Sequence, residues 1–463
     1  MKSTTLSLGG IALLDKAEKD FGLISGIFDG VTKKAKNFEG RVKVLLNNRL
    51  THGVSVHRIL DTYPEECFER LGLKEKPAER SLYRAIEHVG KTSSILHLRY
   101  QAILNKYGLV DKDQLMDFSS TYFEGEKAEL GAFGYSRDRR PDKKQIAFGI
   151  STGMNDIPTA LTIQKGNTQD KKHMQFLLNV AKHVLMKGSL LIFDTGANSK
   201  TNKERIRKME HHYLTLKAKK VKTYKRLIQS FWKDETLQRL KLKKQKYICV
   251  KKKVGDEFLY IFFSPKLFKN QIRKKEDRFE TQKAKGNKLL KKARKHKVIE
   301  KYPSEKGWVE LYPQLQAALK ELNNPYITGI EGFFILESSV DAEPEKILSL
   351  YKTRDKAEKF IRNLKEGIEL RPIRHWNKWA IIGAVFLSFL ANAIIHLTLK
   401  KKKNSPGKNV KLLKKYLTNL SLTVIYPKNA FKLTVVSNIS PPISDIFGDF
   451  VHRYGDKNLN LRW

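Results

Sequence analysis

The chain has 463 residues, of which 90 are Lys or Arg and 48 are Asp or Glu, so its formal charge is +42. The hydrophobic fraction of 40% is enough to build a core, which excludes a wholly disordered basic tail. A charge this large and positive favours a polyanionic partner. Nucleic acid is the commonest one, with a membrane surface as the alternative.

The two cysteines, Cys67 and Cys249, are far apart and show no CxxC or Cys/His spacing. This excludes a disulfide framework and a structural zinc site, and it is typical of a reducing cytoplasm. The apolar run near the N-terminus is short, broken by Gly9 and Gly10, and has no small-residue cleavage site. We therefore interpret it as part of the mature protein.

Residues 1–110 are predicted to form a helical domain that binds DNA ends. Two helices, Asp61–Leu71 and Glu79–Val89, are joined by a short turn, and the second carries Arg80, Tyr83, Arg84 and His88. A helix, a short turn and a basic second helix resemble a helix-turn-helix reader of DNA. An ordinary helical hairpin is the alternative interpretation.

Residues 111–218 are predicted to form the first part of a catalytic domain. Three strands are followed by a helix, a strand, a helix and a last strand. The strands are Gln114–Tyr122, Gln145–Thr152, Thr159–Gln164, Ser189–Phe193 and His212–Leu216, and the helices are Lys171–Met186 and Thr201–Met209. Thr201 and Glu204 have the spacing of a capping box. This order predicts an α/β fold with a ribonuclease-H-like mixed sheet.

Residues 219–327 interrupt the pattern as a basic, β-containing insertion. A hairpin is predicted from Tyr247–Val254 and Glu257–Ser264, and a very basic tract follows at 266–301. The tract is either a surface that tracks phosphates or a solvated face. Four aromatic residues in or near it could stack on unpaired bases or pack in a core: Trp232, Tyr302, Trp308 and Tyr312.

Residues 328–400 are predicted to complete the catalytic domain, and 401–463 to form a basic linker and tail. The segment Trp379–Leu399 is apolar and long enough to span a bilayer. However, Ser388, Asn392 and His396 form one polar stripe along it, and basic residues flank both ends. We therefore predict a core helix packed under the sheet and no membrane span.

Two carboxylates occupy positions suited to phosphodiester chemistry, which on DNA commonly uses two divalent cations held by carboxylate oxygens. Asp117 lies within an otherwise apolar and hydroxyl-bearing strand, and Asp194 ends the most hydrophobic strand. A carboxylate in either place is costly unless it is paired or binds a metal. Both are therefore candidate metal ligands.

A third candidate lies in a helix predicted from Pro344 to about Gly367. Tyr351, Arg354, Glu358 and Lys365 fall within about 60° on one narrow face of that helix. Glu358 could hold a metal while the two basic residues hold phosphate oxygens; ordinary surface ion pairs are the alternative. Other acids that could compete for the site are Glu124, Asp138, Asp142, Asp170 and Glu337.

The spacing Tyr351-x2-Arg354-x3-Glu358-x6-Lys365 resembles the Y-(2)-R-(3)-E-(6)-K signature of DDE transposases of insertion-sequence family four. Four upstream segments are similar to the family in the same order. They are the strand with Asp117, the stretch Gly134–Gln145, the loop Gly166-Asn167-Thr168-x-Asp170, and Ile192-Phe193-Asp194-x-Gly196. The resemblance covers about residues 50–400.

The resemblance implies a cut-and-paste DNA transposase in which Asp117, Asp194 and Glu358 are the catalytic residues. It implies two Mg²⁺ or Mn²⁺ ions per site as cofactors, with Tyr351, Arg354 and Lys365 as DNA or phosphate contacts. The partners would be double-stranded DNA, namely terminal inverted repeats and target, and a second copy in a synaptic dimer. The expected location is a prokaryotic cytoplasm, on the nucleoid.

One residue departs from the family pattern, because Thr195 stands where an arginine often follows the second aspartate. On the resemblance, this departure either weakens a phosphate contact or marks a subgroup of the family, and it leaves the three expected metal ligands in place. The alternative is a catalytically silent DNA-binding protein derived from a transposase. The loss of a triad residue would indicate that alternative, and none is lost from this sequence.

Overall fold

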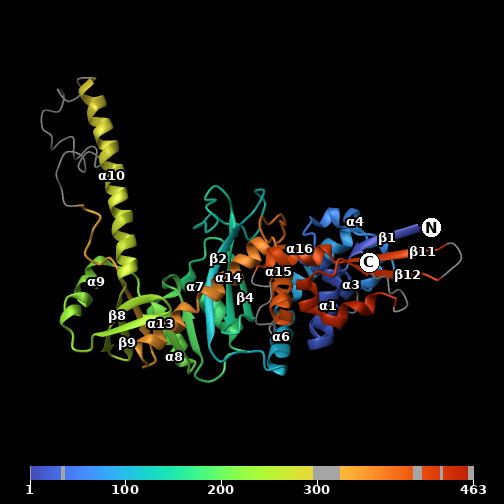
Figure 1. Cartoon of the computed structure of the whole chain (residues 1–463), viewed down its shortest axis with the longest axis horizontal. Helices are drawn as coiled ribbons and strands as arrows, with labels where there is room; N and C mark the ends of the chain where they lie inside the picture. Colours follow the sequence, from blue (N-terminus) through green and yellow to red (C-terminus); the bar gives the residue numbers. More distant parts are fainter. Residues whose placement is uncertain (1, 33–36, 296–323, 400–408, 428–430, 457–463) are drawn as a thin grey trace. The chain divides into compact units, whose positions relative to one another are not determined.

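A computed structural model describes residues 2–32, 37–295, 324–399, 409–427 and 431–456 (Figure 1). The chain forms two compact units. Unit 1 comprises Met1–His211 and Thr353–Trp463, and unit 2 comprises His212–Lys352. Unit 2 is therefore a continuous segment inserted into unit 1, and it is wider than the insertion predicted at 219–327.

Unit 1 contains a mixed sheet with the spatial order β4-β3-β2-β5. The strands are β2 (Gln114–Tyr122), β3 (Gln145–Gly153), β4 (Pro158–Lys165) and β5 (Leu190–Phe193). β2, β3 and β4 pair antiparallel, whereas β2 and β5 pair parallel. The predicted mixed α/β arrangement is confirmed, with each of these strands within one residue of its predicted bounds.

Helices cover both faces of this sheet. α7 (Asp170–Ala181) contacts β3 and β4, and its His173 ring lies 5.2 Å from the ring of Phe118 on β2. α14 (Asp355–Arg362) contacts β2 and β3 and approaches the neighbouring residue, Asp117. Successive side chains on a strand point to opposite faces, so these two helices lie on opposite sides of the sheet.

The helices N-terminal to the sheet are α1 (Gly9–Phe21), α2 (Leu23–Phe28), α3 (Phe38–Leu50), α4 (Ile59–Thr62), α5 (Glu65–Arg70) and α6 (Glu79–Lys106). The predicted helix at 61–71 is divided into α4 and α5, because Pro64 holds Tyr63 in an extended conformation. The predicted helix at 79–89 is the first part of the much longer α6.

α8 (Lys200–Lys208) is capped by Ser199, which accepts a hydrogen bond from the amide of Asn202, so the predicted Thr201 cap is wrong.

The apolar segment forms α15 (Lys378–Leu399), which packs against α6, α1, α3 and β4. Among the described residues it is the one helix long and apolar enough to cross a membrane, and 83% of its most apolar window is buried inside the protein. Two residues of its polar stripe have hydrogen-bond partners there, since Ser388 donates to the Ala384 carbonyl and Asn392 to the Phe360 carbonyl, whereas Nε2 of His396 has none in the described part of the chain. The structure thus places it as a core helix that packs chiefly on α6 and also contacts β4.

Two glycines allow α6 and α15 to approach closely (Figure 1). A Cβ atom on Gly90 would lie 1.8 Å from the Trp379 carbonyl oxygen, and one on Gly383 would lie 1.9 Å from the Ile86 carbonyl oxygen. Each helix therefore leaves room for the backbone of the other. No side chain larger than hydrogen fits at either position unless the helices separate.

The C-terminal part is folded onto the N-terminal helices. Its elements are α16 (Val410–Asn419), β11 (Ser421–Tyr426), β12 (Leu433–Ser437) and α17 (Pro441–Phe447). β11 pairs antiparallel with β12 and with β1 (Lys2–Ser7), the strand at the start of the chain. The predicted tail at 401–463 is therefore folded in its described part, and the predicted helical domain at 1–110 begins with a strand, because these two segments pair with each other. The predicted linker at 400–408 lies outside the described residues.

The strands of unit 2 pair antiparallel in the order β6-β10-β9-β8-β7. Its elements are β6 (His212–Leu216), α9 (Val221–Ile228), β7 (Gln238–Leu242), β8 (Gln245–Val254), β9 (Glu257–Phe263), α10 (Pro265–Lys295), β10 (Phe333–Ser338) and α13 (Pro344–Lys352). The predicted hairpin is confirmed as β8 and β9, which turn at Gly255. The basic tract at 266–301 begins as α10, and its last residues lie outside the described residues. Tyr302, Trp308 and Tyr312, which follow it, also lie outside the described residues.

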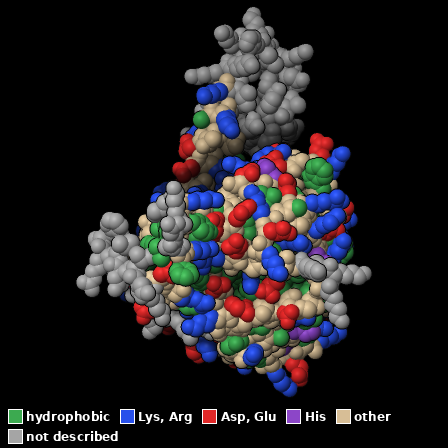
Figure 2. All heavy atoms as spheres, turned by 90° about the vertical axis from the view of Figure 1, so that its right-hand side faces the viewer, with side chains coloured by type: hydrophobic (Ala, Val, Ile, Leu, Met, Phe, Trp, Pro, Cys, Tyr) green, Lys and Arg blue, Asp and Glu red, His purple; other side chains and the backbone are tan. Residues whose placement is uncertain are grey.

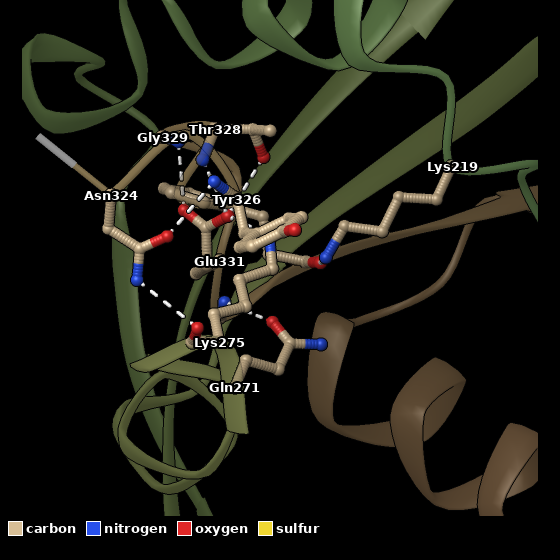
Figure 3. A network of polar contacts seen from close by, with 10 residues as sticks. Lys219, Gln271, Lys275, Asn324, Tyr326, Thr328, Gly329 and Glu331 are labelled. Atoms are coloured by element: carbon tan, nitrogen blue, oxygen red, sulfur yellow. Dashed lines mark hydrogen bonds and ion pairs between the residues drawn. The ribbon is translucent and has the colours of Figure 1, made fainter. Parts of the chain in front are cut away.

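The base of α10 is fixed by one buried carboxylate, Glu331 (Figure 3). Its oxygens accept hydrogen bonds from Lys275 on α10, from the amide and hydroxyl of Thr328, and from the amide of Gly329. Burial alone raises the pKa of Glu331, but these hydrogen bonds outweigh it and lower the pKa to about 2. The charged form of Glu331 therefore stabilises unit 2.

We predict that Gly90→Ala and Gly383→Ala each destabilise unit 1 by roughly 3 kcal/mol or more. A better helix former at these positions would gain only about 1 kcal/mol, which is less than the cost of separating two helix backbones. The measurement is urea unfolding followed by circular dichroism. Ser94→Ala, at an exposed position of α6, is the control and should change stability by less than about 0.5 kcal/mol. Wild-type stability in both glycine variants would contradict the close crossing.

We predict that Glu331→Gln destabilises unit 2 at neutral pH by about 1–3 kcal/mol, the usual loss for hydrogen bonds to a charged group. Because the folded pKa is depressed, this contribution is present above the ordinary carboxyl pKa and is lost as pH falls from about 4.5 towards 2. The difference in unfolding free energy between wild type and variant should therefore shrink on acidification. Glu276→Gln, on the exposed face of α10, is the charge-matched control. A pH-independent difference would be inconsistent with this role.

Candidate active site

The parallel pairing of β2 and β5 brings the first two candidate carboxylates together. Met116 lies opposite Phe193 in this ladder, so the next residues, Asp117 and Asp194, are neighbours where β5 ends. The Asp117 side chain is 16% exposed and that of Asp194 is 45% exposed. One carboxylate is thus largely withdrawn from water and the other is open to solvent.

Glu358 comes from α14, which packs on β2 and β3. The structure corrects the prediction of one continuous helix from 344 to 367. α13 ends at Lys352, a turn follows at Thr353 and Arg354, and α14 continues into a π-helical turn, Asn363–Gly367. The four residues of the signature spacing therefore do not share one regular helix face.

The turn places Arg354 among the three carboxylates. Its Nη1 lies 3.4 Å from an oxygen of Asp117 and 3.8 Å from an oxygen of Asp194, and its Nη2 lies 2.5 Å from an oxygen of Glu358. Residues from two strands and one helix therefore converge on a single guanidinium. The structure brings all three predicted triad residues together.

The electrostatics of the site follow from this crowding. Burial raises the pKa of the Asp117 carboxyl to about 6; Arg354 acts to lower it, and Glu358 and Asp194 add to the increase. A single guanidinium therefore does not fully compensate the carboxylates that surround it. Additional positive charge at this position would be favourable.

The donor chemistry fits a hard divalent cation, since three carboxylates supply only oxygen ligands. Within the described residues, however, no group of three or more His, Cys, Asp and Glu side chains has the spacing of a formed metal site. The carboxylates are arranged around Arg354 instead. Binding of metal between them would require the guanidinium to move away.

Lys365 is directed to a different partner. It is 7% exposed, and its ammonium lies 2.8 Å from an oxygen of Asp138, which also accepts a hydrogen bond from Arg371 at 2.9 Å. Asp138 is itself only 3% exposed. No local pattern indicates that Asp138 is a buried partner of two basic residues, because both lie more than two hundred positions away.

The remaining predicted contacts are Arg80, Arg84 and Tyr351. Arg80 and Arg84 are exposed near the start of α6 and form no ion pair with any residue that the structure describes. Tyr351 belongs to unit 2 and is half-buried at the end of α13. The structure therefore leaves the two arginines open to a ligand.

The competing acids all have other partners. Glu124 pairs with Lys143, Asp142 with Arg140, and Asp170 with Arg137, while the buried Glu337 of unit 2 pairs with Lys217. Asp170 also lies beside Gly196, the glycine two residues after Asp194. A Cβ atom on Gly196 would lie 2.4 Å from an oxygen of the Asp170 carboxylate, so a larger residue there would displace that carboxylate.

The basic surplus is spread over the surface. On the face drawn in Figure 2, Lys and Arg side chains are numerous, with Asp and Glu side chains between them. This distribution is suited to long-range attraction of a polyanion.

The comparisons with known proteins are sparse. No protein-family model matches the chain, and no curated protein sequence matches it. Among solved structures, the piggyBac transposase synaptic complex with hairpin DNA is similar over 88% of this chain and 80% of that chain. The sequence identity is 10% and the TM-score is 0.42. Similarity this low does not establish a common fold.

We predict that Asp138→Asn destabilises unit 1 by roughly 3–5 kcal/mol, because it leaves the buried Lys365 ammonium without its countercharge. Equilibrium urea unfolding measures the effect. Asp142→Asn is the matched control in the same loop: its ion pair with Arg140 is exposed, so the unfolding midpoint should not change. Equal midpoints for both variants would show that the Asp138 ion pairs are not structural.

Proposed function

We propose that this protein is a DDE-type DNA transposase that cleaves and joins phosphodiester bonds at the ends of an insertion sequence. The observation that carries the proposal is the convergence of Asp117, Asp194 and Glu358 on one position. They come from adjacent parallel strands and a helix on one face of the sheet. The strands of this sheet lie in the order β4-β3-β2-β5, which is third, second, first and fourth when they are counted along the chain from β2. This order supports a ribonuclease-H-like catalytic core.

We further propose that these three carboxylates hold two Mg²⁺ or Mn²⁺ ions. When bound, such ions supply activation of the attacking oxygen and charge stabilisation at the leaving oxygen. The chain's own contribution is positional. The β2–β5 ladder fixes Asp117 beside Asp194, and the packing of α14 on β2 and β3 brings Glu358 over them.

Arg354 has a second role in this proposal. In the absence of DNA it partly neutralises the carboxylates, which keeps three negative groups together in a partly buried place. A guanidinium released from them presents several N–H donors to the oxygens of a phosphate. The same side chain would thus exchange carboxylates for the DNA backbone as the substrate enters.

Lys365 and Tyr351 remain proposed phosphate contacts. The ammonium of Lys365 is held by Asp138, so contact with DNA requires a rearrangement of that pair. Arg80 and Arg84 are proposed to contact the terminal inverted repeats. Double-stranded DNA, a second copy in the synaptic complex and a location on a prokaryotic nucleoid complete the proposal.

A catalytically silent DNA-binding protein is the second candidate, and the position of Arg354 is the observation that favours it. A guanidinium among three carboxylates can substitute for a cation permanently. In that case the surplus of basic residues would still bind DNA, but no divalent ion would enter the site.

We predict that Asp117→Asn, Asp194→Asn and Glu358→Gln each reduce DNA cleavage by about three orders of magnitude or more, because a lost ligand removes several kcal/mol of transition-state stabilisation. The assay is Mn²⁺-dependent cleavage of a plasmid that carries the gene with its flanking DNA. Gel-shift affinity should persist in all three variants, since it depends on charges elsewhere. Titration calorimetry should show Mn²⁺ binding to wild type and its loss in the variants.

Asp355→Asn is the matched control, because Asp355 is an exposed acid of the same helix that pairs with Lys359. It should retain cleavage and Mn²⁺ binding. Wild-type protein that binds DNA but neither binds Mn²⁺ nor cleaves would favour the silent DNA-binding protein. Cleavage retained by Glu358→Gln but lost in Glu337→Gln would mean that the third ligand is misassigned.

A further inference from the structure

Unit 1 contains a cavity that is distinct from the carboxylate cluster. It has a volume of about 440 Å³ and lies between α3, the loop 53–58, the first half of α6, the segment 369–375 and α15. This size is within the range of small-molecule sites and larger than a bare phosphate requires. No triad residue lines it.

The charge of the lining is strongly one-sided. Four arginines, Arg49, Arg58, Arg371 and Arg374, face one carboxylate, Glu369. That carboxylate is already paired with Lys414 at 3.0 Å. The cavity therefore has a positive surplus that is suited to an anion.

Two of these arginines are free to bind a ligand. Arg58 and Arg374 are exposed and form no ion pair with any of the residues that the structure describes. The other two are held in place: Arg49 donates to the Glu369 carbonyl at 3.1 Å, and Arg371 is paired with Asp138. Burial lowers the pKa of the Arg49 guanidinium and the charge of Glu369 opposes this effect.

The rest of the wall is aromatic and apolar. The rings of Tyr83 and His375 meet edge to face with centroids 6.1 Å apart, and Tyr83 is 38% exposed. The buried side chains of Leu45, Ile86 and Leu387 also line the cavity. Burial, followed by the charge of Arg49, lowers the pKa of His375 to about 4, so this ring is neutral at neutral pH. An uncharged planar group fits against such a wall.

We propose that this cavity binds a nucleotide, with its phosphate on Arg58 and Arg374 and its base against Tyr83 and His375. The arginines and the aromatic wall together determine the class of ligand. Exposed guanidinium groups bind phosphate, whereas the aromatic pair and the apolar side chains can contact a base but form no favourable contact with inorganic phosphate. The nucleotide is either free in solution or the end of a DNA strand. This site does not depend on the triad or on metal.

The test is isothermal titration calorimetry of the full chain with deoxyadenosine monophosphate and, separately, with inorganic phosphate. A chelator is present throughout, so that the carboxylate cluster cannot contribute through metal. Arg58→Ala combined with Arg374→Ala should weaken binding of the nucleotide by about tenfold or more. Arg226→Ala combined with Arg239→Ala, which removes two exposed charges from unit 2, should leave it unchanged within about twofold.

Tyr83→Leu separates the base from the phosphate. It should weaken the nucleotide several-fold and leave inorganic phosphate unaffected, because only the nucleotide contacts the aromatic wall. Competition by a single strand with a terminal phosphate would identify the strand end as the source of the ligand. Failure of the strand to compete would identify a free nucleotide, and both results agree with the cavity as the site.

Three results would overturn the proposal. They are the absence of saturable nucleotide binding to the wild type, equal losses in the two double-arginine variants, and equal effects of Tyr83→Leu on nucleotide and phosphate. Circular dichroism of each variant checks the fold, and the exposure of Arg58, Arg374 and Tyr83 predicts that it is preserved. Because the test is free of metal, its outcome is independent of whether the chain cleaves DNA.

Discussion

Repulsion among three carboxylates is the constraint on which the arrangement of unit 1 depends. Asp117, Asp194 and Glu358 would separate if their charges were not compensated, and Asp117 is too buried for water to screen it well. Arg354 supplies the compensation from a turn between two helices. Because α13 ends before Arg354, this guanidinium lies in the turn, within 4 Å of all three carboxylates.

The support for this cluster comes from the core behind it. Asn392 of α15 donates to the Phe360 carbonyl of α14, and the rings of Phe360 and His396 are 5.3 Å apart. α15 in turn is fixed against α6 by the reciprocal glycine contacts. The position of Glu358 thus depends on a packing series that runs from α6 through α15 to α14, so a change at Gly90 or Gly383 can disturb the candidate site without touching it.

Local patterns predicted most of the strands of unit 1, because period-two hydrophobicity and turn residues act over a few positions. They also predicted that Asp117 and Asp194 follow apolar runs. The close crossing at Gly90, the buried role of Asp138 and the pairing of β1 with β11 could not be predicted, because each depends on a partner far away in sequence. The helix break before Arg354 could not be predicted for a related reason. The carboxylates of Asp117 and Asp194, which contact Arg354 in this turn, come from strands that are distant in sequence.

The pairing of β1 with β11 also affects the order in which the protein can form. Lys2–Ser7 needs Ser421–Tyr426 to complete its ladder, so unit 1 stays unfinished on the ribosome until translation has passed residue 426. Unit 2 is one continuous segment and can fold before the C-terminal part of unit 1 has been synthesised. During that interval β1 lacks β11, the strand with which it pairs. A chaperone that binds unpaired strands is therefore expected to associate with the nascent chain.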